Sequence, residues 1–167
     1  HRIAVGAYRL RDGRLERTER IEIDVVGERT EVPGLVGVEQ PDLLLVNDDD
    51  LSYAKVRLDA RSLTTATEHV AAFTESLPAS LVLASAWDMT RDAELPGRQF
   101  VDLVLGALPT VTDSTLLRTL LQQLSTTVLT YSDPASRDDL RARVRDALEA
   151  LARTAEPGND AQLQLVG

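Results

Sequence analysis

Three consecutive aspartates, Asp48, Asp49 and Asp50, follow a run of aliphatic residues and are the first candidates for chemistry in this sequence. Clustered carboxylates can bind a divalent cation, and neighbouring carboxylates raise one another's pKa, which suits an acid catalyst. A third interpretation is a polar turn, because Asp side chains hydrogen-bond to their own backbone and tolerate positive φ angles.

The spacing of the residues after Asp48 argues against calcium. An EF-hand loop needs Gly at its sixth position and a bidentate carboxylate at its twelfth. A loop that begins at Asp48 has Tyr53 at the sixth position and Asp59 at the twelfth. Acid catalysis lacks a supporting motif with a His or Lys base. The sequence therefore favours a turn between two strands and assigns no chemistry to the three aspartates.

The two histidines, His1 and His69, form no zinc motif. A zinc-peptidase helix has the pattern HExxH, but the fourth residue after His69 is Phe73. Cysteine is absent, so thiolate metal sites and disulfides are excluded. The GxSxG, GxGxxG and GxxxxGK[ST] patterns are absent too. We therefore predict no catalytic, cofactor-binding or metal-binding residue in this chain, and His69 is expected on a half-exposed helix face.

A second polar cluster lies in AWDMTRDAEL, residues 86–95. At helical spacing, Asp88 would form surface pairs with Arg91 or Asp92, while Trp87 continues an apolar stripe. A structural role is therefore predicted for this cluster.

The composition limits the class of protein and of partner. The 167 residues carry a net charge of -9, and 43% of them are hydrophobic. This suits one domain or two small ones with a core. An acidic chain without a basic patch is a poor match for nucleic acid or for an anionic membrane surface. No apolar run approaches the roughly 20 residues that span a bilayer, and no signal peptide is visible. A cytoplasmic protein is predicted.

The first 58 residues have the pattern of antiparallel strands. Alternation of apolar side chains predicts strands over residues 2–10, 18–26 and 53–58, and a buried strand over 42–46. Asp12-Gly13 is a favoured hairpin turn between the first two. The predicted strands are too few to complete a sandwich.

From Asp59 onward the apolar residues recur every three or four positions, which predicts helices. Stripes lie within residues 63–77, 78–95, 100–108, 116–128 and 134–151, with a sixth helix beginning near 160. Asp113 is the predicted N-cap of the fourth helix, and Asp133 followed by Pro134 is the predicted start of the fifth. Short links between amphipathic helices favour antiparallel neighbours, as in an α-solenoid. The predicted fold class is α+β, with domains at 1–58 and 59–167.

Two segments, PDLLLVNDDDLSYAKVRLDARSL (41–63) and AWDMTRDAEL (86–95), together resemble the C-terminal part of actinobacterial aminopeptidase N, a zinc metallopeptidase. The likeness extends to EPGNDAQLQLV (156–166) and covers nearly the whole chain. It implies part of a small β-sandwich followed by the first helices of a C-terminal solenoid of the HEAT or armadillo kind.

The family's catalytic and zinc-binding residues match no position here, so the resemblance implies a non-catalytic piece of a longer enzyme. In the parent, zinc activates a water that attacks the first peptide bond of a peptide substrate. The piece is expected to support and enclose the active-site cavity, with the catalytic domain of its own chain as partner.

Both ends of the chain look cut, since it begins with His1 and ends within a helical pattern. An isolated piece is expected to expose apolar surface and to dimerise. The competing hypothesis is a stand-alone helical scaffold that binds a protein partner on a concave face.

Overall fold

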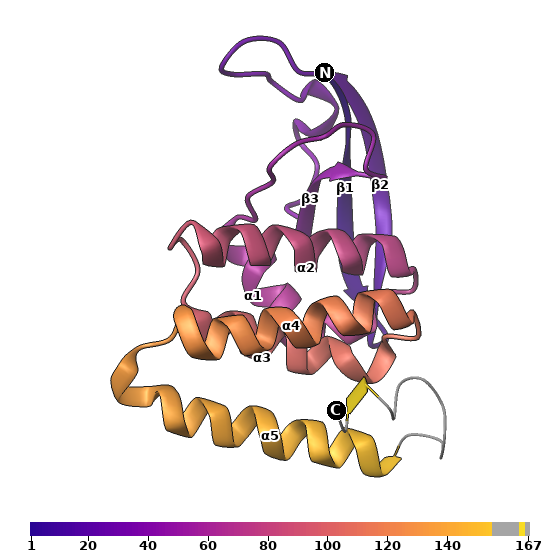
Figure 1. The fold of residues 1–167 in the computed structure, drawn as a ribbon. Helices are drawn as coiled ribbons and strands as arrows, with labels where there is room; N and C mark the ends of the chain where they lie inside the picture. The colour runs from indigo at the N-terminus through magenta and orange to yellow at the C-terminus, as the bar shows by residue number, and fades with distance from the viewer. Residues whose placement is uncertain (155–163, 166–167) are drawn as a thin grey trace. The chain divides into compact units, whose positions relative to one another are not determined.

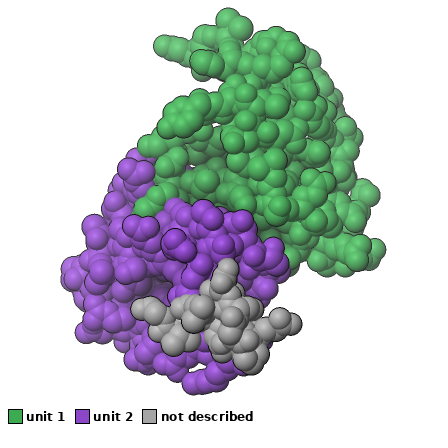
Figure 2. All heavy atoms as spheres, turned by 45° about the vertical axis from the view of Figure 1, so that its right-hand side comes forward, with its two compact units in different colours: residues 1–88 green, residues 89–167 purple. Residues whose placement is uncertain are grey.

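The computed structural model describes residues 1–154 and 164–165, and in this part of the chain it has an α+β fold (Figure 1). Within these described residues, a three-stranded antiparallel sheet precedes five α-helices, and short 3₁₀ turns join the first helix to the second, the third to the fourth and the fourth to the fifth. The chain divides into two compact units, residues 1–88 and residues 89–167 (Figure 2). The predicted α+β class is confirmed. The predicted domain boundary between residues 58 and 59 stays a prediction.

The sheet consists of β1 (Arg2–Arg11), β2 (Arg14–Asp24) and β3 (Leu43–Asp48) in the order β2-β1-β3. Asp12 and Gly13 form the β1–β2 turn with φ angles of 49° and 75°, as the sequence predicted. The central strand β1 is buried on both faces over residues 3–8, whereas β2 alternates and carries most of its charged side chains outward.

The outer edge of β3 is occupied by the first helix, α1 (Ala60–His69). The backbone N–H of Leu44 donates to Ser62 Oγ (2.8 Å), and Thr65 Oγ1 donates to the carbonyl of Asp42 (2.7 Å). These hydrogen bonds satisfy backbone N–H and C=O groups at the edge of β3 to which a further strand would have to bond. The predicted strand over residues 53–58 is wrong for this structure: the segment has no strand pairing, and Tyr53 is fully exposed.

The first helix after the sheet begins at a residue that satisfies one of its free N–H groups. Asp59 caps α1 through a bond from the N–H of Ser62 to Asp59 Oδ1 (3.0 Å). After the 3₁₀ turn η2 (Val70–Ala72), α2 runs over Ser76–Arg91. The predicted single stripe over residues 63–77 is therefore divided between two helices.

The remaining helices are α3 (Gly97–Ala107), α4 (Ser114–Thr130) and α5 (Arg137–Thr154), with 3₁₀ turns η3 (Leu108–Thr110) and η4 (Pro134–Ser136) between them. The predicted cap of α4 is confirmed, because Asp113 Oδ1 accepts from the N–H of Leu116 at 2.7 Å. Asp133 and Pro134 begin η4 rather than α5 itself. In Figure 1 the chain direction reverses between α4 and α5, as predicted for short links.

The core of the second unit lies where α3, α4 and α5 pack on one another. Its fully buried side chains come mainly from α3 and α4, and include Phe100, Val101, Leu103, Val104, Leu120 and Leu124. An ion pair between Asp102 and Arg143 joins α3 to α5 at the surface. Among the helices of residues 1–154, none combines the length and apolar character that a membrane crossing requires.

Candidate functional site

A β-bulge near the end of β3 sets the direction in which the first aspartate points. Val46 lies opposite Val5 on β1, but Asp48 lies opposite Ala4, so Asn47 is the extra residue. Asn47 has a φ of 58°, which suits a bulge. Because side chains alternate between faces, one inserted residue moves the next side chain to the other face of the sheet. Asp48 is thereby placed on the face to which Ala4 belongs.

A second bulge lies on β2 and places an arginine opposite a tyrosine. Ala7 pairs with Glu19 and Tyr8 pairs with Arg17, which leaves Thr18 as the extra residue. The hydroxyl of Thr18 donates to the carbonyl of Ala7 at 3.2 Å and satisfies the carbonyl at the irregularity. Tyr8 is therefore directly opposite a cation on the neighbouring strand.

Asp48, Tyr8 and Arg17 meet in a buried cluster that links all three strands. The phenol of Tyr8 lies 3.0 Å from Oδ1 and 2.9 Å from Oδ2 of Asp48. Arg17 Nη1 donates to Oδ2 at 2.9 Å. The Asp48 side chain is 0% exposed, and that of Arg17 is 28% exposed. A buried carboxylate is tolerated only with such hydrogen-bond partners, so both donors stabilise the burial of Asp48.

The second aspartate extends this cluster toward the surface. Asp49 accepts from Arg17 Nη1 at 2.7 Å and from Arg20 Nε at 2.5 Å. Arg20 also donates to Glu22 at 2.7 Å. Hydrogen bonds from Arg17 and then Arg20 hold the pKa of Asp49 below its ordinary value. Charges of opposite sign thus alternate from the buried carboxylate to the exposed edge of β2.

The turn after β3 is held by its own polar groups. Asp49 and Asp50 have φ angles of 70° and 53°, and the N–H of Asp50 donates to the carbonyl of Asn47 at 3.0 Å. The Asn47 amide donates to the carbonyl of Ser52 (2.7 Å) and its oxygen accepts from the N–H of Ser52 (3.2 Å). Ser52 Oγ donates in turn to the carbonyl of Arg2 at 2.6 Å. The turn is therefore fixed to the first residue of β1.

The three aspartates have three different positions. Asp49 and Asp50 form a polar turn, as predicted, but the turn follows β3 and does not lead into a second strand. Asp48 differs from the prediction, because it is the last residue of β3 and is fully buried. The bulge at Asn47 causes the difference, and period-2 alternation contains no sign of a bulge.

The buried cluster has the geometry of a structural junction. Tyr8 is 2% exposed and its ring meets Phe73 edge-to-face, with centroids 5.3 Å apart. Burial, followed by the hydrogen bond to Asp48, raises the pKa of the Tyr8 phenol. A phenol that stays protonated, behind an aromatic ring and paired with a carboxylate, is not placed to exchange protons with a bound molecule. The cluster joins the strands.

Zinc does not fit the residues whose positions the structure gives. Among residues 1–154 and 164–165, no three His, Cys, Asp or Glu side chains gather as a metal site requires. His69 is half-exposed at the end of α1, as predicted, with its Nε2 3.8 Å from a carboxylate oxygen of Glu68.

The second predicted cluster lies at the end of α2. Trp87 and Asp88 are half-buried on the helix, and Arg91 is its last residue. Asp92 and Glu94 follow in an exposed loop. The predicted surface pairs of Asp88 stay a prediction.

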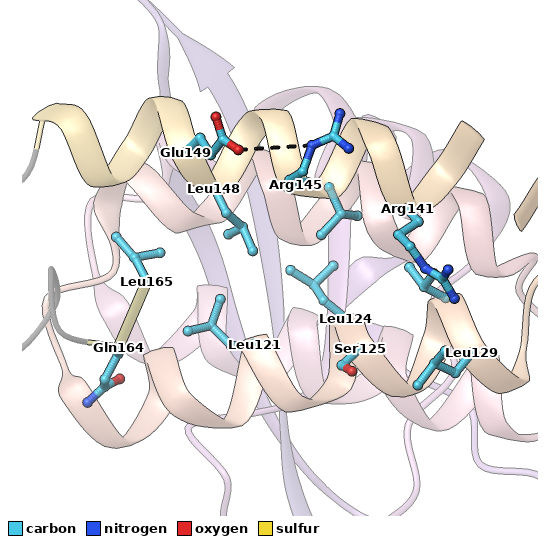
Figure 3. Close-up of a pocket in the computed structure, with 12 residues that line it drawn as sticks. Leu121, Leu124, Ser125, Leu129, Arg141, Arg145, Leu148, Glu149, Gln164 and Leu165 are labelled. Carbon is cyan, nitrogen blue, oxygen red and sulfur yellow. Dashed lines mark ion pairs between the residues drawn. The ribbon is translucent and has the colours of Figure 1, made fainter. Parts of the chain in front are cut away.

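An apolar groove runs between α4 and α5 (Figure 3). Its volume is about 430 Å³, and leucine and valine side chains of both helices form its floor. The charged side chains at its rim are Arg141, Arg145 and Glu149. Gln164 and Leu165 lie at one end of the groove, and Leu129 at the other. We call this surface the α4–α5 groove.

A smaller hollow of about 350 Å³ lies on another side of α5, against the end of α3 and η3. It is lined by Leu105, Leu108, Pro109, Ala147, Ala150, Leu151 and Thr154. Helix α5 therefore borders two apolar depressions, while its buried positions, Leu140 and Val144, pack inward.

The partners of the aspartates were absent from the sequence-based prediction. Tyr8 and Arg17 are separated from Asp48 by 40 and 31 residues, so no local pattern contains them. Arg17 and Arg20 stand in a part of β2, residues 16–20, that has no apolar residue, so alternation identifies neither their face nor their partners. The available signal was the presence of arginines on β2 that could pair with a carboxylate.

Comparisons with known proteins agree with the resemblance found in the sequence. Aminopeptidase N of Streptomyces lividans is 51% identical over 164 residues, which cover 98% of this chain and 19% of the relative's own length. The chain therefore spans about a fifth of the relative it matches. Residues 43–166 match the sequence model of the ERAP1-like C-terminal domain. This match covers well over half of the chain, which thus belongs to the family of ERAP1-like C-terminal domains.

Proposed function

We propose that this chain is a non-catalytic part of a zinc-dependent aminopeptidase, which removes N-terminal amino acids from peptides. The observation that carries the proposal is 51% identity over 98% of the chain to an aminopeptidase N. The α+β fold and the match to an ERAP1-like C-terminal domain support it further. The residues that would bind zinc and activate water lie outside this chain under the proposal.

Within the parent enzyme, residues 1–58 would belong to a β-sandwich and residues 59–167 would begin a helical solenoid. The three-stranded sheet supports the assignment of residues 1–58, because both faces of β1 are buried, as in a sandwich. Completion of the sandwich would need further strands. The antiparallel packing of α4 and α5 supports the second. The partner would be the catalytic domain of the same chain, and the helices would wall the cavity that peptides enter. The parent would act in the cytoplasm.

Isolation of the native protein tests the proposal. An antibody against this chain would capture it from source cells, and three quantities would be measured: mass, zinc content and release of N-terminal amino acids. We expect a polypeptide far heavier than 18.3 kDa that carries zinc and activity. A zinc-free protein near 18.3 kDa without activity would overturn the proposal in favour of a stand-alone scaffold.

The enclosing role needs a test of its own within the active parent enzyme. Substitution of a groove residue, Leu148→Glu, would disturb the helices without touching catalytic residues. We expect kcat/KM to change more for long peptides than for a dipeptide, since only long peptides would contact the cavity wall. Leu148→Met is the matched control. Equal changes for both substrate lengths would contradict a role in enclosing the cavity.

A further inference from the structure

We propose that the outer edge of β2 pairs with the same edge of a second copy of this chain, in one antiparallel register that is centred on Ile21. The proposal rests on residues of the sheet and of the loop that follows it, and it does not depend on the proposed function.

The outer edge of β2 has no partner strand among the described residues. In the sheet order β2-β1-β3, β1 lies on one side of β2 only, and in Figure 1 β2 forms one side of the sheet. An isolated bridge between Leu15 and Phe73 occupies the beginning of this edge. The edge of an outer strand presents N–H and C=O groups that a strand of another chain can bind.

The end of the hairpin shows which residues direct their backbone groups outward. The N–H of Val25 donates to the carbonyl of His1 at 2.7 Å, and the amino terminus of His1 donates to the carbonyl of Val25 at 3.3 Å. Val25 therefore directs its backbone groups toward β1. Because successive residues of a strand alternate in this respect, Arg20, Glu22 and Asp24 direct theirs to the outer edge.

Charge selects one register for the pairing of two identical edges. The regular stretch of β2 covers residues 19–24, because the bulge at Thr18 interrupts the strand before it. When two copies pair around Ile21, Arg20 of each copy lies directly opposite Glu22 of the other. Every other centre within the stretch places two charges of the same sign directly opposite each other, which is destabilising.

The side chains at this centre are already fixed in the single chain. Arg20 donates to Asp49 at 2.5 Å and to Glu22 at 2.7 Å, so pairing would immobilise few further rotamers. Ile21 is half-buried, and a Cβ atom at Gly34 would lie 2.8 Å from its Cδ1 atom, so the loop after β2 packs against this side chain. Two copies would bring four alternating charges together on one face and two isoleucines on the other.

The length of the regular stretch limits the strength of the dimer. A pairing between two stretches this short buries far less surface than a stable obligate dimer needs. The association is therefore weak, and the fraction of dimer depends on protein concentration. The twofold symmetry makes the contact self-limiting, because each chain uses its one open edge.

Cysteine cross-linking tests the register, because the chain has no cysteine of its own. In Ile21→Cys, the two substituted residues would face each other with their Cα atoms about 4.5 Å apart, which a disulfide can span. The control is Ile23→Cys, because Ile23 is half-buried on the same face, but its two copies would lie roughly 13 Å apart. After mild oxidation we expect a doubled mass for Ile21→Cys and a single chain for Ile23→Cys.

The other results of cross-linking would overturn the proposal. A doubled mass in equal yield for both variants would mean that the copies associate without a fixed register. A doubled mass for Ile23→Cys alone would mean that a different register is used. Single chains for both variants would mean that the edges do not pair.

Mixing of two charge variants tests the opposed pairs without disulfide geometry. Glu22→Arg and Arg20→Glu each place like charges opposite each other, so each variant alone should have a dissociation constant at least about tenfold higher than the unsubstituted chain. An equimolar mixture restores both opposite-charge pairs and should recover the association. Sedimentation velocity over a wide range of protein concentration measures all three samples.

The control for the charge variants is Glu28→Arg, which makes the same change of net charge as Glu22→Arg on an exposed residue outside β2. It should leave the dissociation constant unchanged. A mixture that stays monomeric, or an equal weakening by Glu28→Arg, would contradict the proposal. Arg20→Glu loses its bond to Asp49, and if this variant does not fold, the result for the two cysteine variants decides the question.

Discussion

Gly6 lies directly beneath the carboxylate of Asp48. A Cβ atom at position 6 would overlap Oδ2 of Asp48 and would lie 2.9 Å from a ring carbon of Tyr8. Because Gly6 has no side chain, β1 leaves the space in which the carboxylate of Asp48 is buried. We expect Gly6→Ala to destabilise the fold by about 1–3 kcal/mol, the usual cost of overpacking.

Chemical denaturation of the 167-residue chain measures this effect. The control is Gly27→Asn, because a Cβ at position 27 meets no atom within 4 Å and Asn tolerates the φ of 72° found there. Equal stabilities of Gly6→Ala and the unsubstituted chain would show that Asp48 does not occupy this space.

Removal of the buried carboxylate should be among the most destabilising single changes in the first unit. Asp48→Ala leaves the buried Tyr8 phenol without its acceptor, which costs about 1–3 kcal/mol, while Arg17 keeps Asp49 as a partner. Asp50→Ala replaces an exposed residue, but its φ of 53° adds backbone strain, so Asp50→Asn is the better control. Urea denaturation should separate the two variants clearly. Similar midpoints would contradict a structural role for Asp48.

The stability of the fold should fall in acid, because some carboxyl groups have a lowered pKa in the folded chain. The Arg17 and Arg20 hydrogen bonds lower the pKa of Asp49, and the N–H of Leu10 lowers that of Asp42, from the ordinary value of 3.8. A carboxyl group whose pKa is lower in the folded than in the unfolded chain stabilises the fold at pH values above its unfolded-state pKa. This stabilisation is complete by about pH 5, and it is lost as the pH falls through the folded-state pKa. Urea midpoints measured from pH 7 downward should show the decline.

The variant Asp49→Asn should have a shallower decline in acid, because one of the depressed carboxyl groups is absent. Glu28→Gln is a suitable comparison on an exposed residue outside the cluster. An acid limb of unchanged slope in Asp49→Asn would show that Asp49 does not contribute to the pH dependence.

Ser62 should stabilise the contact between α1 and the edge of β3. Its hydroxyl accepts from the N–H of Leu44 and donates to Asp59 Oδ2 at 2.6 Å, and the residue is buried. Ser62→Ala leaves a backbone N–H without its partner, which costs about 1–3 kcal/mol. Thr64→Ala, on the exposed side of the same helix, should stay within about 0.5 kcal/mol. Thermal denaturation of both variants checks this, and equal losses would be contrary to expectation.

The elements that alternation or helical spacing specifies were predictable from the sequence. The hairpin at Asp12-Gly13, the strand at 42–46 and the cap at Asp113 depend on neighbouring residues alone, and the structure has all three. The strand expected at 53–58 depends on a partner strand. Hydroxyl groups of α1 occupy the adjacent edge of β3, and alternation carries no information about that competition.

The candidate site was predictable only in part. Adjacent aspartates indicated a turn, and Asp49 and Asp50 form one. The burial of Asp48 follows from a bulge at Asn47 and from partners on two distant strands. Bulges and long-range pairing are tertiary features, so the period of the side chains could not indicate them.

The burial of Tyr8 also sets an alkaline limit to the fold. A free phenol ionises near pH 10, but in the folded chain burial and the neighbouring Asp48 raise the pKa of Tyr8. Because the pKa of Tyr8 is higher in the folded than in the unfolded chain, its stabilisation of the fold is complete at pH values below the unfolded-state pKa. This stabilisation is lost as the pH rises beyond that pKa. In strong base the sheet should come apart before this phenol can ionise, and the appearance of its phenolate would then report unfolding.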